Sequence, residues 1–186
     1  MREVLRDSIG ANGWEQQVLF GKNVSPIEQI AQLQHGHISV NQIKAIIDAE
    51  HWSDYFKFAV VRNPFDRFVS VCAFYNRQSD DFTRNPQAWM KAAMMRPQFQ
   101  QRLLVRPQAS QLLNQHGKLE LDYIGRYELL QDSMNVITDK LNITRTTLPV
   151  KNSSKHENYK KYYDESLYRS VAEFYKDDLQ LFAYDF

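Results

Sequence analysis

The chain contains 186 residues, and its 23 Lys and Arg residues against 22 Asp and Glu residues give a formal net charge of +1. This length suits one domain with a packed core, which we expect to span residues 1–186. The nearly balanced charge argues against a dedicated nucleic-acid binder, which would carry a strong basic excess, but it allows an anionic or neutral glycan in a local cleft.

No apolar stretch approaches the roughly 20 residues of a membrane span, and no signal peptide opens the chain. The sequence therefore leaves the compartment open, cytoplasmic or membrane-associated, and it leaves homo-oligomerisation open as well. Cys72 is the only cysteine, so an intrachain disulfide is excluded. Its position on the apolar side of a predicted helix favours a core thiol over a nucleophile.

The first part of the chain is predicted to form short helices. Residues 2–9 favour a helix that ends before Gly10, and residues 17–20 favour a short strand. Ser25 and Ser39 each stand three residues before a Glu or Gln, which is the capping-box pattern for the start of a helix.

The centre of the chain predicts a strand that turns directly into a helix. An apolar run over residues 56–61 indicates the buried strand, and the segment Arg62-Asn-Pro-Phe-Asp-Arg-Phe-Val-Ser70 follows it at once. The segment predicts a helix over 64–75, because Asn63 can cap the helix and Pro64 suits its first position.

After this helix the chain alternates between helices, strands and loops. We expect a loop over 80–87, a helix interrupted by Pro97 and Pro107 over 89–114, a strand with its turn over 119–127, an amphipathic helix over 129–141, a loop over 144–161 and a last helix over 164–177. These elements predict an α/β fold with a parallel sheet flanked by helices, although the number of strands is low for that class.

The turn between the central strand and helix is a candidate anion site. A strand that ends in Arg62 and turns into a helix presents a guanidinium and helix N–H groups to an anion, and Ser70 adds a hydroxyl. The structural alternative is that the Arg pairs with a surface carboxylate and that the Ser is only solvated or bonded to its own helix.

The sequence from Arg62 to Ser70 resembles the 3′-phosphate-binding motif of the sulfotransferases that use 3′-phosphoadenosine 5′-phosphosulfate (PAPS). It is most similar to the motif of their carbohydrate branch. His35-Gly36-His37 resembles the His-Gly-His segment of the uronosyl 2-O-sulfotransferases, which act on heparan and dermatan chains. Tyr123-Ile-Gly-Arg-Tyr-Glu128 is similar to the strand whose Tyr-Glu pair lies near the adenine. The tail from Leu148 onward is similar to the family's C-terminal loop and helix, so the likeness covers most of the chain in the family's order.

The resemblance implies a P-loop-type sulfotransferase fold, PAPS as sulfuryl donor, adenosine 3′,5′-bisphosphate (PAP) as product and a carbohydrate acceptor. It assigns the 3′-phosphate to Arg62 and Ser70. It assigns the role of general base to His37, with His35 assisting the acceptor or orienting the base. Tyr127 becomes a candidate neighbour of the adenine, and a core tyrosine after a strand is the equal alternative.

Two further groups are implied less specifically. The family's loop that closes over the nucleotide phosphates is matched by four residues, Lys151, Asn152, Ser154 and Lys155. A solvated basic loop is the default alternative for them. Three arginines that could face an anionic glycan are Arg67, Arg77 and Arg84.

The two histidines also permit other interpretations. In an extended segment His35 and His37 would face the same side, which suits a shared cleft and would equally suit a metal pair. No third and fourth ligands at suitable spacing are evident, so we expect no metal. Two surface or capping histidines before a helix are the structural alternative.

The family's fold begins with a strand and a Lys/Thr/Gly-rich loop that binds the phosphosulfate, whereas residues 1–7 resemble the helix that follows this loop. We therefore expect a chain truncated at its N-terminus that lacks this strand and loop, or else a complete but inactive relative. Either case predicts weak PAPS binding and very low turnover, because the loop would supply donors to the leaving group. The alternative functions are a catalytically inactive PAP-binding or interaction module and a nucleotide kinase-like phosphotransferase; the lack of a Walker-type loop counts against the latter.

Overall fold

The computed structural model describes residues 1–9, 28–32, 37–149 and 158–186. The chain divides into two compact units. Unit 1 comprises Met1–Val60 and Gln111–Pro149, and unit 2 comprises Val61–Ser110 and Val150–Phe186. The expectation of a single domain stays a prediction.

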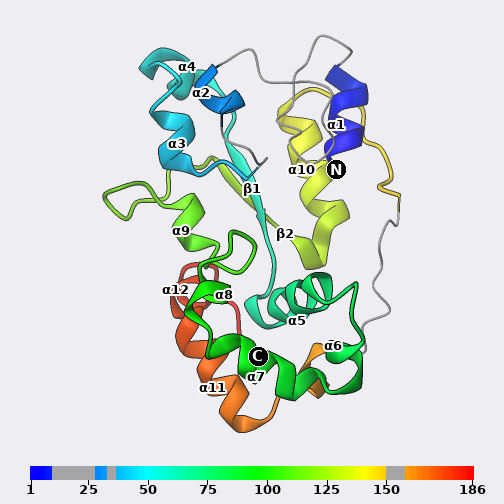
Figure 1. Cartoon of the computed structure of the whole chain (residues 1–186). Coiled ribbons are helices and arrows are strands. Elements are labelled where there is room, and N and C mark those ends of the chain that lie inside the picture. The colour runs from blue at the N-terminus through cyan, green and yellow to red at the C-terminus, as the bar shows by residue number, and fades with distance from the viewer. Residues whose placement is uncertain (10–27, 33–36, 150–157) are drawn as a thin grey trace. The chain divides into compact units, whose positions relative to one another are not determined.

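Unit 1 contains a small parallel sheet of two strands, β1 (Phe58–Val61) and β2 (Tyr123–Arg126), which run side by side in Figure 1. The last residue of β1 already belongs to unit 2. The strands predicted over 56–61 and 119–127 are confirmed, and each is shorter than the segment that predicted it. Together with the helices, this sheet confirms the α/β class.

Helix α10 (Leu130–Lys140) follows β2 through a 3-10 turn, η1 (Tyr127–Leu129), and packs against β2. This contact requires a glycine, because a Cβ built at Gly125 would lie 2.7 Å from the Cβ of Ser133 and 2.8 Å from its Oγ. The Ser133 hydroxyl accepts a hydrogen bond from the Arg126 N–H at 2.9 Å and donates one to the Arg126 carbonyl at 3.1 Å. Ser133 thus joins the helix to the end of the strand.

The other helices that lie wholly in unit 1 are α1 (Arg2–Ile9), α2 (Glu28–Ala31), α3 (Val40–Lys44) and α4 (Ala49–Asp54). The predicted capping box at the start of α3 is confirmed: Ser39 accepts from the Gln42 N–H, and the Gln42 side chain accepts from the Ser39 N–H. The strand predicted over 17–20 and the start of the helix predicted at Ser25 lie outside the described residues.

Unit 2 begins with the turn into helix α5 (Pro64–Tyr75), whose bounds are those predicted from the sequence. Pro64 occupies the first position, and the Asn63 side chain accepts from the Phe65 N–H at 2.9 Å. The inner side of the helix is fully covered: Phe68 and Cys72 each have no exposed surface. The prediction of a core thiol is therefore confirmed.

The loop predicted over 80–87 is wrong. The structure has helix α6 (Asp81–Arg84) there, and α7 (Pro86–Met94) begins at the proline that suggested a break. A proline at the first position of a helix loses no hydrogen bond, and the Asn85 side chain caps the helix by accepting from the Ala88 N–H at 3.1 Å. Pro97 likewise opens α8 (Pro97–Gln100), and the chain leaves unit 2 within α9 (Ala109–Leu112).

The C-terminal part of unit 2 consists of a 3-10 helix, η2 (Tyr159–Tyr162), followed by α11 (Glu165–Phe174) and α12 (Lys176–Leu181). Asp164 caps α11 as predicted, by accepting from the Leu167 N–H at 2.9 Å. The single helix predicted over 164–177 instead breaks at Tyr175. The Tyr175 side chain is fully buried, and its hydroxyl donates to the Val105 carbonyl at 2.6 Å.

The core of unit 2 is rich in aromatic rings, and it brings the C-terminus to the start of α5. The Phe186 ring packs edge-on against Phe65, with ring centroids 4.9 Å apart, and also against Tyr168 at 5.0 Å. These contacts place the last residues of the chain beside the strand–helix turn. Within the described part of the chain, no helix is long and apolar enough to cross a membrane.

Candidate functional site

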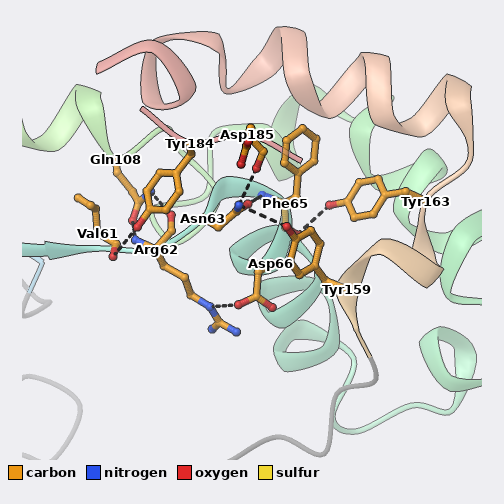
Figure 2. Close-up of polar contacts among 10 residues, drawn as sticks. All are labelled: Val61, Arg62, Asn63, Phe65, Asp66, Gln108, Tyr159, Tyr163, Tyr184 and Asp185. Carbon is orange, nitrogen blue, oxygen red and sulfur yellow. Dashed lines mark hydrogen bonds and ion pairs between the residues drawn. The ribbon is translucent and has the colours of Figure 1, made fainter. Parts of the chain in front are cut away.

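The strand–helix turn of unit 2 places a guanidinium beside a carboxylate. Arg62 Nε donates to Asp66 Oδ2 at 2.6 Å, and Figure 2 shows the Arg62 side chain extending to this contact. The Arg62 side chain is 18% exposed and that of Asp66 is 21% exposed, so the pair is accessible without being fully solvated. The alternative pairing of Arg62 with a carboxylate therefore exists in the structure.

The geometry of this ion pair orients the Arg62 guanidinium. A guanidinium carries five N–H donors in a plane, and the contact to Asp66 uses the one on Nε. A fixed Nε also limits the directions in which the rest of the fork can point. The arrangement therefore gives the Arg62 head a preferred orientation at the start of α5.

Ser70 lies on the same side of α5 as Asp66, because residues four apart in a helix are neighbours on its surface. The Ser70 side chain is partly buried, and its hydroxyl makes no hydrogen bond to another described residue. A guanidinium, a carboxylate and a hydroxyl thus follow one another along one side of the first two turns. Arg62 and Ser70 are the two members of this row that can donate hydrogen bonds to an anion.

Hydrogen bonds between this turn and the C-terminal part of unit 2 hold its backbone and cap (Figure 2). The Tyr184 hydroxyl donates to the Val61 carbonyl at 3.2 Å, and the Tyr163 hydroxyl donates to the Phe65 carbonyl at 2.8 Å. Between them, Asn63 Nδ2 donates to the Asp185 carbonyl at 2.8 Å. The turn is therefore fixed by residues far away in the sequence as well as by its own cap.

Gln108 holds the backbone of Arg62 on both sides. Its Oε1 accepts from the Arg62 N–H at 3.0 Å, and its Nε2 donates to the Arg62 carbonyl at 2.9 Å. Behind it, Asp178 accepts from the Gln108 and Ala109 N–H groups at 2.8 and 2.6 Å, and from Gln108 Nε2 at 3.3 Å. By accepting from the Gln108 and Ala109 N–H groups, Asp178 also satisfies N–H groups at the start of α9, which have no partner within the helix.

Asp178 is fully buried. Burial raises the pKa of its carboxyl group above the ordinary value, and the N–H donors of Ala109 and Gln108 act in the opposite direction. An ionised carboxylate in such a place is costly unless it is hydrogen-bonded, which is what these donors provide.

Neither Gln108 nor Asp178 is among the site residues predicted from the sequence. A local signal existed for Asp178: Leu167, Val171, Tyr175 and Asp178 are spaced four, four and three residues apart, which would place the aspartate on the buried side of a continuous helix. No such signal existed for Gln108, because its contact to Arg62 joins positions 46 residues apart.

The predicted residues of unit 1 are described only in part. His37 is exposed and lies just before the Ser39 cap of α3, and Tyr127 is 43% exposed at the start of η1. His35 lies outside the described residues, so the relation of the two histidines is not described.

In unit 2, the loop residues Lys151, Asn152, Ser154 and Lys155 also lie outside the described residues. The three arginines have separate surroundings. Arg67 donates to the Arg106 carbonyl at 3.1 Å, Arg77 lies over the Phe74 ring at 4.5 Å, and Arg84 is the exposed last residue of α6. No contact between any two of these three arginines is found in the described part of the chain.

Among the described residues, no group of three or more His, Cys, Asp and Glu side chains could hold a metal ion. His51, for example, pairs with Asp48 at 2.6 Å, and the hydrogen bonds from His51 lower the pKa of that carboxyl group.

Comparison with known proteins gives one match. The family model described as "Sulfotransferase family" matches residues 21–185, which is most of the chain. Searches of the curated proteins and of the solved structures found no match.

Proposed function

The chain belongs to the sulfotransferase family, and on this basis we propose that it transfers a sulfuryl group from PAPS to a hydroxyl group of a carbohydrate. The observation that supports the donor is the turn from β1 into α5, where Arg62 and Ser70 lie at the spacing of an anion clamp. The mixture of helices and a small parallel sheet is consistent with the P-loop-type sulfotransferase fold.

Arg62 and Ser70 would bind the 3′-phosphate of PAPS. The residues present fit such a group, since a phosphate accepts hydrogen bonds from a guanidinium fork and from a hydroxyl at the same time. The dipole of the 12-residue helix α5 adds positive potential at its N-terminal end. Asp66 would keep the Arg62 guanidinium oriented through its contact with Nε.

In the proposed reaction the acceptor oxygen forms a bond to sulfur while the bond between sulfur and the phosphate oxygen of PAPS breaks. The acceptor hydroxyl loses its proton in this step, and PAP leaves with the electron pair of the broken bond. We assign the proton to His37, since a histidine titrates near neutral pH and a well-placed general base contributes about 10²–10⁴ in rate. His35 would assist the acceptor or orient this base.

The remaining assignments belong to the same proposal. Tyr127 would lie near the adenine, and its partial exposure is compatible with a ring contact. The segment with Lys151, Asn152, Ser154 and Lys155 would close over the nucleotide phosphates. An acidic glycan would meet Arg67, Arg77 and Arg84, of which Arg84 and Arg77 are exposed.

The test of the transfer is an assay with PAPS that is radiolabelled in its sulfuryl group and a panel of glycan acceptors. We expect slow but measurable label transfer to the glycan with the wild-type chain, in keeping with the very low turnover predicted from the sequence, and a further loss of about a hundredfold or more in rate with His37→Ala. His116→Ala is the matched control, because His116 is an exposed histidine of the same unit without an assigned role.

Label transfer that is unaffected by His37→Ala would remove His37 from the role of base. Binding of PAP without any transfer to the panel would favour a non-catalytic PAP-binding module of the same fold. Transfer of phosphate from a nucleoside triphosphate instead would favour a kinase-like activity and contradict the proposal.

A further inference from the structure

We infer that Gln108 is a positioning residue for the nucleotide site: its side-chain amide fixes the peptide of Arg62, and Asp178 fixes that amide. The inference rests on the proposed function, since it concerns how Arg62 is held for the 3′-phosphate. Neither residue belongs to the motif from Arg62 to Ser70. Both would act on the nucleotide only through Arg62, because their contacts are with other groups of the protein.

The Gln108 side chain binds both the N–H and the carbonyl of the Arg62 backbone. It accepts from the Arg62 N–H at 3.0 Å and donates to the Arg62 carbonyl at 2.9 Å. A carboxylate can only accept, and an ammonium or guanidinium can only donate. A primary amide is therefore the side-chain group that suits both contacts at once, and Figure 2 shows it lying against the Arg62 backbone.

Asp178 supports the same orientation of the Gln108 amide that the Arg62 peptide requires. The two N–H donors of Gln108 Nε2 have one acceptor each, the Arg62 carbonyl at 2.9 Å and Asp178 Oδ2 at 3.3 Å. A flipped amide would turn its oxygen toward the carboxylate and the carbonyl, which both only accept. The Arg62 peptide and Asp178 thus favour the same orientation, in which the amide oxygen meets the Arg62 N–H.

The hydrogen bonds of Gln108 affect the proposed phosphate site through the backbone of Arg62. Arg62 lies between the end of β1 and the Asn63 cap of α5, outside both elements, so neither a strand nor a helix ladder fixes its peptide. The Gln108 amide replaces that ladder at this single residue. Gln108 thus holds the backbone of Arg62, and Asp66 holds the guanidinium at the end of its side chain. Such preorganisation lowers the cost of ordering a long side chain when a ligand binds.

The test compares the affinities for PAP and for adenosine 5′-monophosphate (AMP), which differ only by the 3′-phosphate. The ratio of the two dissociation constants isolates the contribution of that phosphate, whereas a general loss of structure would lower both affinities together. It is measured by calorimetry on the wild-type chain, Gln108→Ala and the matched control Gln101→Ala, whose glutamine is exposed in the same unit.

We expect Gln108→Ala to reduce the preference for PAP by roughly tenfold, since two hydrogen bonds to the Arg62 peptide are lost. The affinity for AMP should change little, and Gln101→Ala should match the wild type. In an Arg62→Ala background, Gln108→Ala should have no further effect on the ratio, because the side chain that it positions is absent.

A second variant keeps the test decisive if Gln108→Ala does not fold. Gln108→Met keeps the length and approximate volume of the side chain without adding charge beside Asp178, but its thioether cannot donate to the Arg62 carbonyl and is only a weak acceptor for the Arg62 N–H. We expect it to fold and to lose part of the preference for PAP.

The outcomes separate the two proposals. A wild-type chain that prefers PAP while the folded Gln108 variants keep that preference would overturn the positioning role and leave the proposed function standing. A wild-type chain that does not distinguish PAP from AMP would overturn the proposed phosphate site, and the positioning role with it.

Discussion

Asp178 shows how one buried carboxyl group serves the candidate site without being part of it. It has no exposed surface, and its oxygens accept from two backbone N–H groups and from the Gln108 amide. Removing one partner from such a group leaves others unsatisfied, which costs more than the bond itself contributes. At the residue scale, the turn at Arg62 therefore depends on an ionisable group from α12.

The titration of Asp178 gives a pH prediction. Burial raises the pKa of Asp178 above 3.8, so the folded chain holds this proton at pH values where the unfolded chain has released it. The protonated carboxyl group thus contributes stability that is fully present below the unfolded pKa and is lost as the pH rises through the folded pKa. Asn does not titrate in this range.

We therefore expect wild type to lose stability relative to Asp178→Asn as the pH rises from about 4 toward neutrality. The measurement is the free energy of unfolding of both proteins by urea at several pH values. A difference between the two proteins that is independent of pH, or that grows in favour of wild type as the pH rises, would contradict the raised pKa.

At the scale of elements, the contact between β2 and α10 depends on the absence of one side chain. A Cβ at Gly125 would meet the Cβ of Ser133 at 2.7 Å, a distance at which one of the two backbones must move. The same Ser133 hydroxyl holds the Arg126 peptide, which directly precedes Tyr127. The packing of α10 and the position of the candidate adenine neighbour are therefore linked within unit 1.

We predict that Gly125→Ala lowers the free energy of unfolding by about 1–3 kcal/mol, as overpacking of a fitted contact does. The double variant Gly125→Ala/Ser133→Gly removes the clashing atoms, so its loss should be smaller than the sum of the two single losses. Urea unfolding of all four proteins measures this cycle. Strictly additive losses would show that the two residues do not press on each other.

Elements with strong local signals could be predicted from the sequence. The bounds of α5 follow from Asn63 and Pro64, which act on the residues next to them. The loop expected over 80–87 was wrong because Pro86 was interpreted as a break, whereas it opens α7. The helix predicted over 164–177 instead ends at Phe174, where the Tyr175 hydroxyl is bonded to Val105, 70 positions away in the sequence.

In the candidate site too, local features could be predicted from the sequence and contacts between distant residues could not. The order strand, Arg62, helix and Ser70 is local and was predicted, as was the chance that a carboxylate pairs with the Arg. The contacts of Gln108 and Tyr184 to the turn join residues 46 and 123 positions apart, and no spacing in the sequence encodes them. Sequence patterns therefore suggested Arg62 and Ser70 as ligand contacts, which stays a prediction, and gave no sign of the residues that hold the Arg62 backbone.

At the scale of the whole molecule, the formal net charge of +1 means that any preference for anions must come from local arrangement. The family match extends over residues 21–185 and thus includes residues of both units. It supports sulfuryl transfer in general, and the donor, the acceptor and the base are our proposals. The central one is that Arg62 and Ser70 bind the 3′-phosphate of the nucleotide.

That claim is tested most directly by calorimetric titration of PAP into the wild-type chain, Arg62→Ala and Ser70→Ala. Matched controls are Arg169→Ala and Ser170→Ala, which are exposed on α11. We predict that PAP binding weakens roughly tenfold to a hundredfold without Arg62 and roughly threefold to tenfold without Ser70, while both controls match the wild type. Equal affinity of all five proteins for PAP would contradict the phosphate clamp.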